Sequence, residues 1–202
     1  MAEQRVLPMF PLGSPLLPFA SLPLHVFEPR YRTMLADCLA GSREFGVVLI
    51  ERGSEVGGGD QRFDVGTVAR IAEVMALPDG RSALTAVGSS RLRVLEWLPE
   101  DPYPRARVEL VLDDVRADAE RRAHVERAFL RVLDLLRRLG ADVPTDIALD
   151  ADAVRAGWEA AAPLGPLDAQ RVLTTDDPDE RLELVASCLD DVAQLLELRL
   201  EP

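Results

Sequence analysis

The residues that most often carry chemistry in proteins are few in this sequence and lie far apart. Its two histidines, His25 and His124, have no cysteine beside them, and no second histidine follows at the i, i+4 spacing of a metal-binding helix. Its two cysteines, Cys38 and Cys188, form no CxxC pair. We therefore expect no metal site and no disulfide framework, and we expect both cysteines to be buried thiols in a reducing cytosol.

Several catalytic and cofactor-binding motifs are missing as well. All 23 basic residues are arginine, and no lysine occurs. A phosphate-binding GxxxxGK[ST] loop, a Ser–Lys dyad and a lysine Schiff base each need the lysine amine, so these residues cannot form them. HExxH and GxSxG are also absent, and acid pairs such as Asp113-Asp114 and Asp190-Asp191 fall at expected linkers and exposed helix faces. We predict no catalytic residue and no cofactor, and we expect that the chain is not an enzyme.

The charge of the chain is strongly negative and unevenly spread. The net charge is −12, with 12 arginines against 14 acidic residues in 1–112 and 11 against 21 in 113–202. Such a chain repels phosphate backbones, so we expect no nucleic-acid partner. The N-terminus lacks the apolar core of a signal peptide, and no run approaches the roughly 20 apolar residues of a membrane helix. We expect a cytoplasmic protein without a membrane partner.

The elements that must position any site begin with a proline-rich stretch over residues 7–27. Prolines at 8, 11, 15, 18 and 23 lack the N–H that a central strand donates, which predicts edge strands or extended connectors and excludes a helix. The spacing also fits a PxxP ligand for an SH3-like groove. We favour a core role, because the intervening residues, including Phe19 and Phe27, are too apolar for an exposed peptide.

A helix is predicted directly after this stretch. Pro29 suits an early helical position, apolar residues follow at helical spacing from Tyr31 to Leu39, and Gly41 ends the pattern. Glu28, Arg30 and Tyr31 are the candidate peptide-binding residues that the sequence offers. A structural role also fits them, since Glu28 lies at the positive end of the helix and can pair with Arg30.

Strands are predicted from Phe45 to Leu112. A continuous apolar run over 45–51 suits a strand buried on both faces, and a flexible loop over 52–62 follows. Further strands are expected at 65–77, 82–87, 91–98 and 105–112, with a break at Gly88. This number and spacing suggest a small closed or nearly closed barrel.

Helical periodicity replaces the strand pattern after Asp114. Helices are expected over 118–139, ended by Gly140, over 150–162, over 167–173, and from Asp177 to the C-terminal region. Asp177 is expected to cap the last helix, followed by Pro178 and Glu180 in an Asp-led capping box. We predict two domains, a β-barrel with one helix over 1–115 and an acidic helical bundle over 116–202, in the α+β class.

Seven motifs of this chain follow one another in a recognisable order: Phe10-Pro-Leu12, Leu22-Pro-Leu24, Phe27-Glu-Pro-Arg-Tyr-Arg32, Phe45-Gly-Val-Val-Leu49, Val65-Gly-Thr-Val-Ala-Arg-Ile71, Pro78-Asp-Gly-Arg81 and Gly88-Ser-Ser-Arg-Leu-Arg-Val94. Together they resemble the substrate-binding N-terminal domain of Lon-type ATP-dependent proteases over about residues 7–112. A helical extension with the pattern Asp177-Pro-Asp-Glu-Arg-Leu182 is similar to the same family. One departure is Phe19-Ala-Ser21, where relatives often carry a glycine after the proline.

The resemblance implies a PUA-like β-barrel with a C-terminal helical subdomain that engages unfolded or tagged polypeptides and helps to assemble an oligomer. The lysine-free sequence lacks the ATPase and protease parts of Lon, so the resemblance is to a stand-alone, bacterial-type member of the family. PUA-like folds also occur in RNA-binding proteins, but a fold alone does not transfer function.

Our leading hypothesis is therefore a non-catalytic, proteolysis-related module that binds polypeptide through barrel-end loops, including 52–62, and a groove between barrel and bundle. The alternative is an adaptor or regulator that docks on a protease or chaperone through its acidic helical half. An enzyme or an RNA-binding protein is less favoured. The sequence leaves the client and the oligomeric state open.

Overall fold

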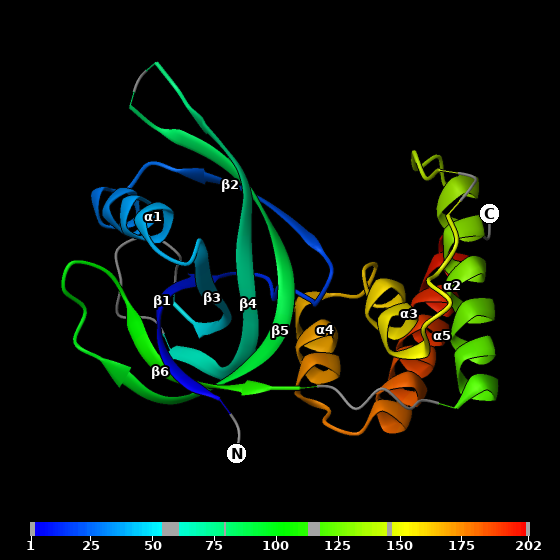
Figure 1. The fold of residues 1–202 in the computed structure, drawn as a ribbon. Helices are drawn as coiled ribbons and strands as arrows, with labels where there is room; N and C mark the ends of the chain where they lie inside the picture. The colour runs from blue at the N-terminus through cyan, green and yellow to red at the C-terminus, as the bar shows by residue number, and fades with distance from the viewer. Residues whose placement is uncertain (1–2, 54–60, 79, 113–117, 145–146, 201–202) are drawn as a thin grey trace. The chain divides into compact units, whose positions relative to one another are not determined.

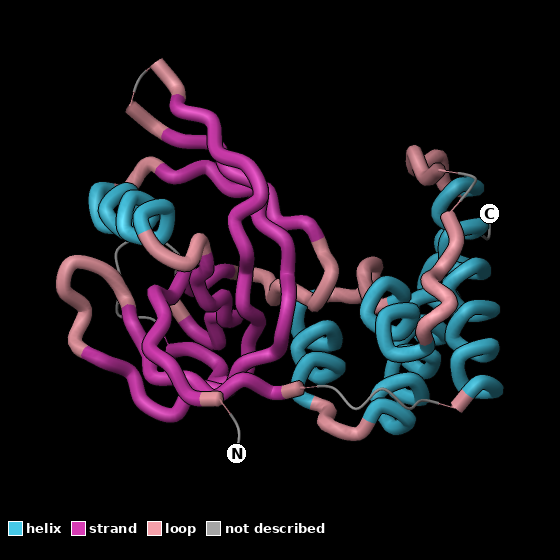
Figure 2. The backbone as a smooth tube through the Cα atoms, in the orientation of Figure 1, coloured by secondary structure: helices cyan, strands magenta, loops and turns pink. Residues whose placement is uncertain are grey.

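The computed structural model of the protein describes residues 3–53, 61–78, 80–112, 118–144 and 147–200. The chain divides into two compact units, Met1–Leu112 and Asp113–Pro202. Figure 2 shows strands in the first unit, and the described part of the second unit is helical. The mixed α+β class is confirmed, with six strands and five helices among the described residues.

The first unit holds one sheet and one helix (Figure 1): β1 Gln4–Leu12, β2 Ser21–Val26, α1 Pro29–Ala40, β3 Glu44–Arg52, β4 Gln61–Ala76, β5 Ser82–Leu98 and β6 Arg105–Val111. Its strand order is β2-β5-β4-β3-β1-β6, and β6 also pairs with β5. Only β1 and β3 pair in parallel; every other described pair is antiparallel. Five strands are therefore linked in a continuous ring of pairings, with β2 added beside β5.

The prediction of a doubly buried strand is confirmed in β3, where Phe45, Val47 and Val48 are almost fully buried. The prediction that prolines mark strand edges is right for Pro23, because β2 pairs with β5 alone. It is wrong for Pro8 and Pro11, because β1 lies inside the sheet order. The prolines fit there because residues 4–8 pair only with β6 and residues 9–12 only with β3, so each proline keeps one unpaired side.

The expected break at Gly88 is also wrong, because β5 continues through it. The segment before β2 crosses β5 at this point: a Cβ on Gly88 would lie 2.2 Å from the backbone oxygen of Leu17. The Gly88 N–H donates to the Ala20 oxygen at 2.9 Å, and the Phe19 N–H donates to the Gly88 oxygen at 2.9 Å. The glycine thus serves a close backbone approach rather than a turn.

Helix α1 covers the first of two hydrophobic cores. Its buried side chains Tyr31, Met34, Leu35 and Cys38 follow the predicted helical spacing, and Gly41 ends the helix. Leu39, which the same pattern assigned to the buried face, is 37% exposed. The second core lies within the sheet and consists of Leu7, Met9, Val48, Val68, Leu92, Val94, Ala106 and Val108.

The second unit contains four helices among its described residues: α2 Ala119–Arg138, α3 Ala153–Ala160, α4 Pro166–Thr174 and α5 Pro178–Leu200. Asp118, Asp152 and Asp177 stand before α2, α3 and α5, and each carboxylate accepts backbone N–H groups of the first turn. The predicted cap at Asp177 is therefore confirmed. The observed α3 is shorter than the expected helix over 150–162, because Asp152 caps it at a later residue.

Helices α2 and α5 pack in parallel. Arg121 on α2 pairs with Glu183 on α5 at 2.7 Å, and ten residues further along α2, Arg131 pairs with Glu197 at 2.8 Å. Leu195 on α5 is 62% exposed, while Ala193 is fully buried. The buried face of α5 therefore includes small residues and leaves some of its leucines exposed.

Candidate functional site

Three neighbouring pockets of the first unit surround α1, β2 and the end of the β4–β5 hairpin. The largest, 670 Å³, lies between α1 and the end of β4. A second, of 290 Å³, is shared by β2, β4 and β5, and a third, of 180 Å³, lies between β1, β2 and the start of α1. The first two share Val74, and the last two share Pro23, Leu24 and His25. Because Val74 packs with the core that α1 covers, its neighbours Glu73 and Met75 point to the opposite face of the sheet, and the 290 Å³ pocket lies on that face. We call the three pockets together the apolar surface.

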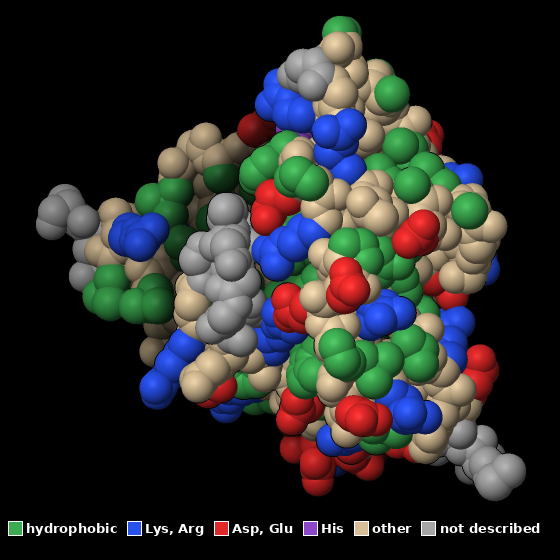
Figure 3. All heavy atoms as spheres, turned by 90° about the vertical axis from the view of Figure 1, so that its left-hand side faces the viewer, with side chains coloured by type: hydrophobic (Ala, Val, Ile, Leu, Met, Phe, Trp, Pro, Cys, Tyr) green, Lys and Arg blue, Asp and Glu red, His purple; other side chains and the backbone are tan. Residues whose placement is uncertain are grey.

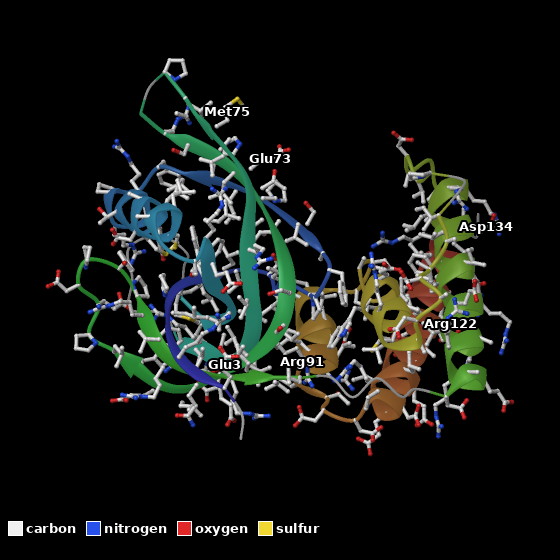
Figure 4. All side chains as sticks on the ribbon, viewed as in Figure 1. Glu3, Glu73, Met75, Arg91, Arg122 and Asp134 are labelled. Carbon is white, nitrogen blue, oxygen red and sulfur yellow. The ribbon has the colours of Figure 1, made fainter. Side chains whose placement is uncertain are left out.

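Each of the three pockets carries one large, exposed hydrophobic side chain on its lining. Leu39 is 37% exposed in the largest pocket, Met75 is 63% exposed in the second, and Phe27 is 54% exposed in the third. Met75 and Glu73 lie on the outer part of β4 in Figure 4. On the face drawn in Figure 3, hydrophobic side chains gather between separate acidic and basic ones. Large exposed apolar groups beside hollows are typical of surfaces that bind other apolar groups.

The predicted residues Glu28, Arg30 and Tyr31 come together at the start of α1. The Arg30 Nε donates to the Glu28 carboxylate at 3.1 Å, and the Arg30 guanidinium carbon lies 4.5 Å from the centre of the Tyr31 ring. Tyr31 is 3% exposed and stacks on Phe10 with ring centres 4.1 Å apart. Glu28 and Tyr31 both line the 180 Å³ pocket. Glu28 and Tyr31 therefore form part of the apolar surface, and their contacts with Arg30 fix the first turn of α1.

A polar contact joins the other side of α1 to Tyr103, in the segment before β6. The Tyr103 hydroxyl donates to the Asp37 carboxylate at 2.7 Å. Burial, together with the hydrogen bond and the negative charge of Asp37, raises the pKa of Tyr103 to about 12. The contact therefore fixes α1 on the sheet while Tyr103 is protonated.

The two cysteines are poorly suited to chemistry. Burial raises the pKa of the Cys38 thiol to about 11, with a further contribution from Asp37. Burial also raises the pKa of Cys188. A thiol with a raised pKa is almost entirely protonated at neutral pH, and a protonated thiol is a weak nucleophile and metal ligand. Both cysteines are buried and free, as the sequence predicted.

No group of three or more His, Cys, Asp or Glu side chains in the described ranges could hold a metal ion. None of the helices in the same ranges is both long and apolar enough to cross a membrane. Residues 54–60 of the expected contact loop over 52–62 lie outside the described part of the chain.

The apolar surface was not predicted from the sequence, because Phe27 was assigned to the core by its hydropathy and Leu39 by its helical spacing. One available signal was strand length: the apolar pattern from Val65 to Leu77 is longer than the neighbouring run over 45–51. The end of the longer strand therefore has to lie beyond its partner. Val74, Met75 and Ala76 lie on that end.

Comparison with known proteins agrees with this architecture. The family model of the ATP-dependent protease La (LON) substrate-binding domain matches residues 6–191. The chain is 29% identical to a Lon protease of Anaeromyxobacter dehalogenans and 26% identical to one of Dictyoglomus thermophilum, each over 96% of this chain. It spans 24% and 25% of those two proteins, so it matches about a quarter of their length.

Two solved structures are similar along nearly the whole chain. One is a Lon N-terminal domain protein from Xanthomonas campestris, with a TM-score of 0.67 and 30% identity, covering 91% of this chain and 98% of that one. The other is the N-terminal domain of a Mycobacterium avium complex Lon protease, with a TM-score of 0.63 and 19% identity, covering 93% and 99%. The second likeness concerns the fold alone. The chain belongs to the family of the ATP-dependent protease La (LON) substrate-binding domain.

Proposed function

We propose that the apolar surface of the first unit binds unfolded or tagged polypeptide without catalysing a reaction. The observation that carries the proposal is that three pockets of one unit share lining residues and that each has one large exposed hydrophobic side chain. Burying a large apolar side chain contributes roughly 1.5–3 kcal/mol before the entropic cost of association. Phe27, Leu39 and Met75 together therefore suit a weak, sequence-tolerant interaction with exposed apolar segments.

The surrounding architecture supports the same proposal. We infer a PUA-like small barrel from the ring of strand pairings, with domains over 1–115 and 116–202. Such a sheet is a rigid support for a binding surface, and a rigid surface loses little entropy on binding. The sequence contains no lysine, so it supplies neither the Walker lysine nor the Ser–Lys dyad that ATP-dependent proteolysis needs. We place the protein in the cytoplasm, since its two buried free thiols suit a reducing compartment.

The direct experiment is a fluorescence anisotropy titration with labelled α-lactalbumin. The reduced and carboxymethylated form, which is unfolded, should bind, whereas the native disulfide-bonded form should not. The affinity should change less than threefold between about 50 and 500 mM NaCl, because contacts between apolar groups are not screened by salt. Equal binding of the native and unfolded forms, or no binding of either, would rule out the proposal.

The adaptor alternative uses the acidic second unit. In that unit Asp190 lies 3.6 Å from Arg131 and 3.9 Å from His124, so reversing its charge would disturb the α2–α5 contact itself. Asp191 is exposed and is the better position for a charge reversal. If the alternative holds, Asp191→Arg should weaken a salt-sensitive association with a protease or chaperone and leave binding of the unfolded probe unchanged.

A further inference from the structure

The end of β4 has no neighbour on one side. β4 runs from Gln61 to Ala76, but its pairing with β3 ends at Arg70, opposite Glu44. Two more bonds follow on this side: the Ile71 N–H donates to the Arg43 oxygen at 2.9 Å, and the Arg43 Nε donates to the Ile71 oxygen at 3.4 Å. From there to Ala76, β4 pairs with β5 alone among the described strands. Figure 1 shows β4 and β5 continuing beyond β3.

The hydrogen-bond pattern shows which backbone groups face the open side. The Leu77 N–H donates to the Arg81 oxygen at 2.8 Å, so this opposed pair is a hydrogen-bonded one, while the Leu77 oxygen accepts from the Gly80 N–H of the turn at 3.0 Å. Opposed pairs in an antiparallel ladder alternate between bonded and non-bonded. Met75, opposite Ala83, therefore bonds to β5, whereas Val74 and Ala76 turn their N–H and C=O groups outward. The register shift between Ile71 and Glu73 reverses which residues of β4 face β5. Ile71 can therefore bond away from β5, to Arg43, although Glu73 and Met75 bond to β5.

The other open edge of this hairpin region is β2, and it is blocked. The backbone N–H and C=O groups of Ala83 and Thr85 point toward β4. Those of Leu84, and of the residues two positions before and after it, therefore point toward β2. Pro23 lies opposite Thr85, so its nitrogen faces away from β5 and offers no donor on the outer edge. Proline on an edge strand hinders pairing with another chain. The β4 edge has no proline between Ile71 and Ala76, and its outward donors remain.

The open β4 edge borders the largest pocket. Val74 and Ala76 line the 670 Å³ pocket together with Leu35, Ala36 and Leu39 of α1. Among the described residues that line this pocket, Arg32 alone is charged. Its positive charge repels basic polypeptide segments. The pocket therefore combines a row of open backbone donors and acceptors with an apolar wall. An extended polypeptide satisfies both, since its backbone repeats every two residues and its side chains alternate between faces.

We propose that an unfolded polypeptide segment adds to β4 as an extra strand, hydrogen-bonded to Val74 and Ala76, with apolar side chains against α1. The segment is neutral or acidic and apolar at alternate positions. This inference rests on the proposed binding of polypeptide and specifies its geometry. The main-chain bonds make binding tolerant of sequence, while the apolar wall and Arg32 select among segments.

The test replaces an outward donor with proline. In Ala76→Pro the lost N–H is not used in the β5 ladder, so the fold should tolerate the change. Ser21→Pro is the matched control, because the Ser21 N–H likewise faces away from β5, on the outer edge of β2. Reduced, carboxymethylated α-lactalbumin should bind Ala76→Pro at least tenfold more weakly than the unsubstituted protein, and Ser21→Pro should bind within twofold.

NMR hydrogen exchange on the unsubstituted protein gives a second readout that needs no variant. Saturation with the same probe should slow exchange of the Val74 and Ala76 amides at least tenfold and leave Met75, already bonded to β5, nearly unchanged. Unchanged exchange at Val74 and Ala76 while the probe is bound would overturn strand addition alone. If the probe does not bind the unsubstituted protein at all, the proposed function fails with it.

Discussion

The hydroxyl of Tyr103 donates a 2.7 Å hydrogen bond to Asp37, and this bond joins the segment before β6 to the exposed side of α1. Tyr103 itself is 7% exposed. Since α1 forms one wall of the apolar surface, the bond fixes the position of the surface as well as the fold. Tyr103→Phe should lower the free energy of unfolding by about 1 kcal/mol at neutral pH, as measured by urea titration.

The same bond predicts a dependence on alkaline pH. Folding raises the pKa of Tyr103 to about 12, whereas an unfolded tyrosine titrates near 10. Because the folded pKa is the higher one, the stabilisation is fully present below about pH 10 and is lost as the pH rises towards about 12. Thermal melting curves should show this loss in the unsubstituted protein and a smaller one in Tyr103→Phe. An equal loss in both would contradict the role of Tyr103.

Gly88 provides a test of the chain crossing at β5. Gly88→Ala would place a methyl group 2.2 Å from the Leu17 oxygen, so the crossing segment has to shift. We expect a loss of about 3 kcal/mol in unfolding free energy. Gly165→Ala is the control, because a Cβ there has no atom within 4 Å. It should change the stability by less than about 1 kcal/mol.

Phe19 occupies a backbone conformation that suits glycine. Its φ is 66°, in the left-handed region that glycine adopts without strain. Phe19→Gly should therefore raise the melting temperature, by the equivalent of about 1 kcal/mol. Phe27→Gly, at a similarly exposed phenylalanine without a positive φ, should not raise it. A lower melting temperature for Phe19→Gly would show that packing of the ring outweighs the backbone strain.

The ion pairs between α2 and α5 predict a salt effect on the second unit. Arg121 pairs with Glu183 at 2.7 Å and Arg131 with Glu197 at 2.8 Å, and all four side chains are substantially exposed. Exposed pairs contribute little and are screened by salt. Arg131→Met should therefore lower the stability only slightly in low salt and hardly at all in 1 M NaCl, as followed by helical circular dichroism. A larger loss that persists in 1 M NaCl would indicate that the Arg131 stem packs in the helix contact.

Local chemistry made much of the fold predictable. Asp177 before α5, Pro29 at the first turn of α1 and the apolar run of β3 each specify their element through contacts within a few residues. The glycine at 140, with a φ of 85°, likewise ends α2 where the sequence predicted. These features can be read from short stretches because their causes are local.

Long-range pairing could not be read in the same way. Gly88 was interpreted as a break because the approaching Leu17 lies 71 positions earlier in the sequence, and nothing near Gly88 indicates it. Pro8 and Pro11 were assigned to edges because the change of partner from β6 to β3 midway along β1 depends on the whole sheet. The apolar surface was missed for the same reason. Met75 and Leu39 have the hydropathy of core residues, and they are exposed only because no other described segment of the fold packs over them.

The central claim is that the apolar surface of the first unit binds unfolded polypeptide, and a matched pair of variants tests it most directly. Met75 and Leu195 are 63% and 62% exposed, but only Met75 lines one of the three pockets. The dissociation constant for reduced, carboxymethylated α-lactalbumin should rise about tenfold or more in Met75→Asp and stay within twofold in Leu195→Asp. Equal affinities of the two variants would contradict the account.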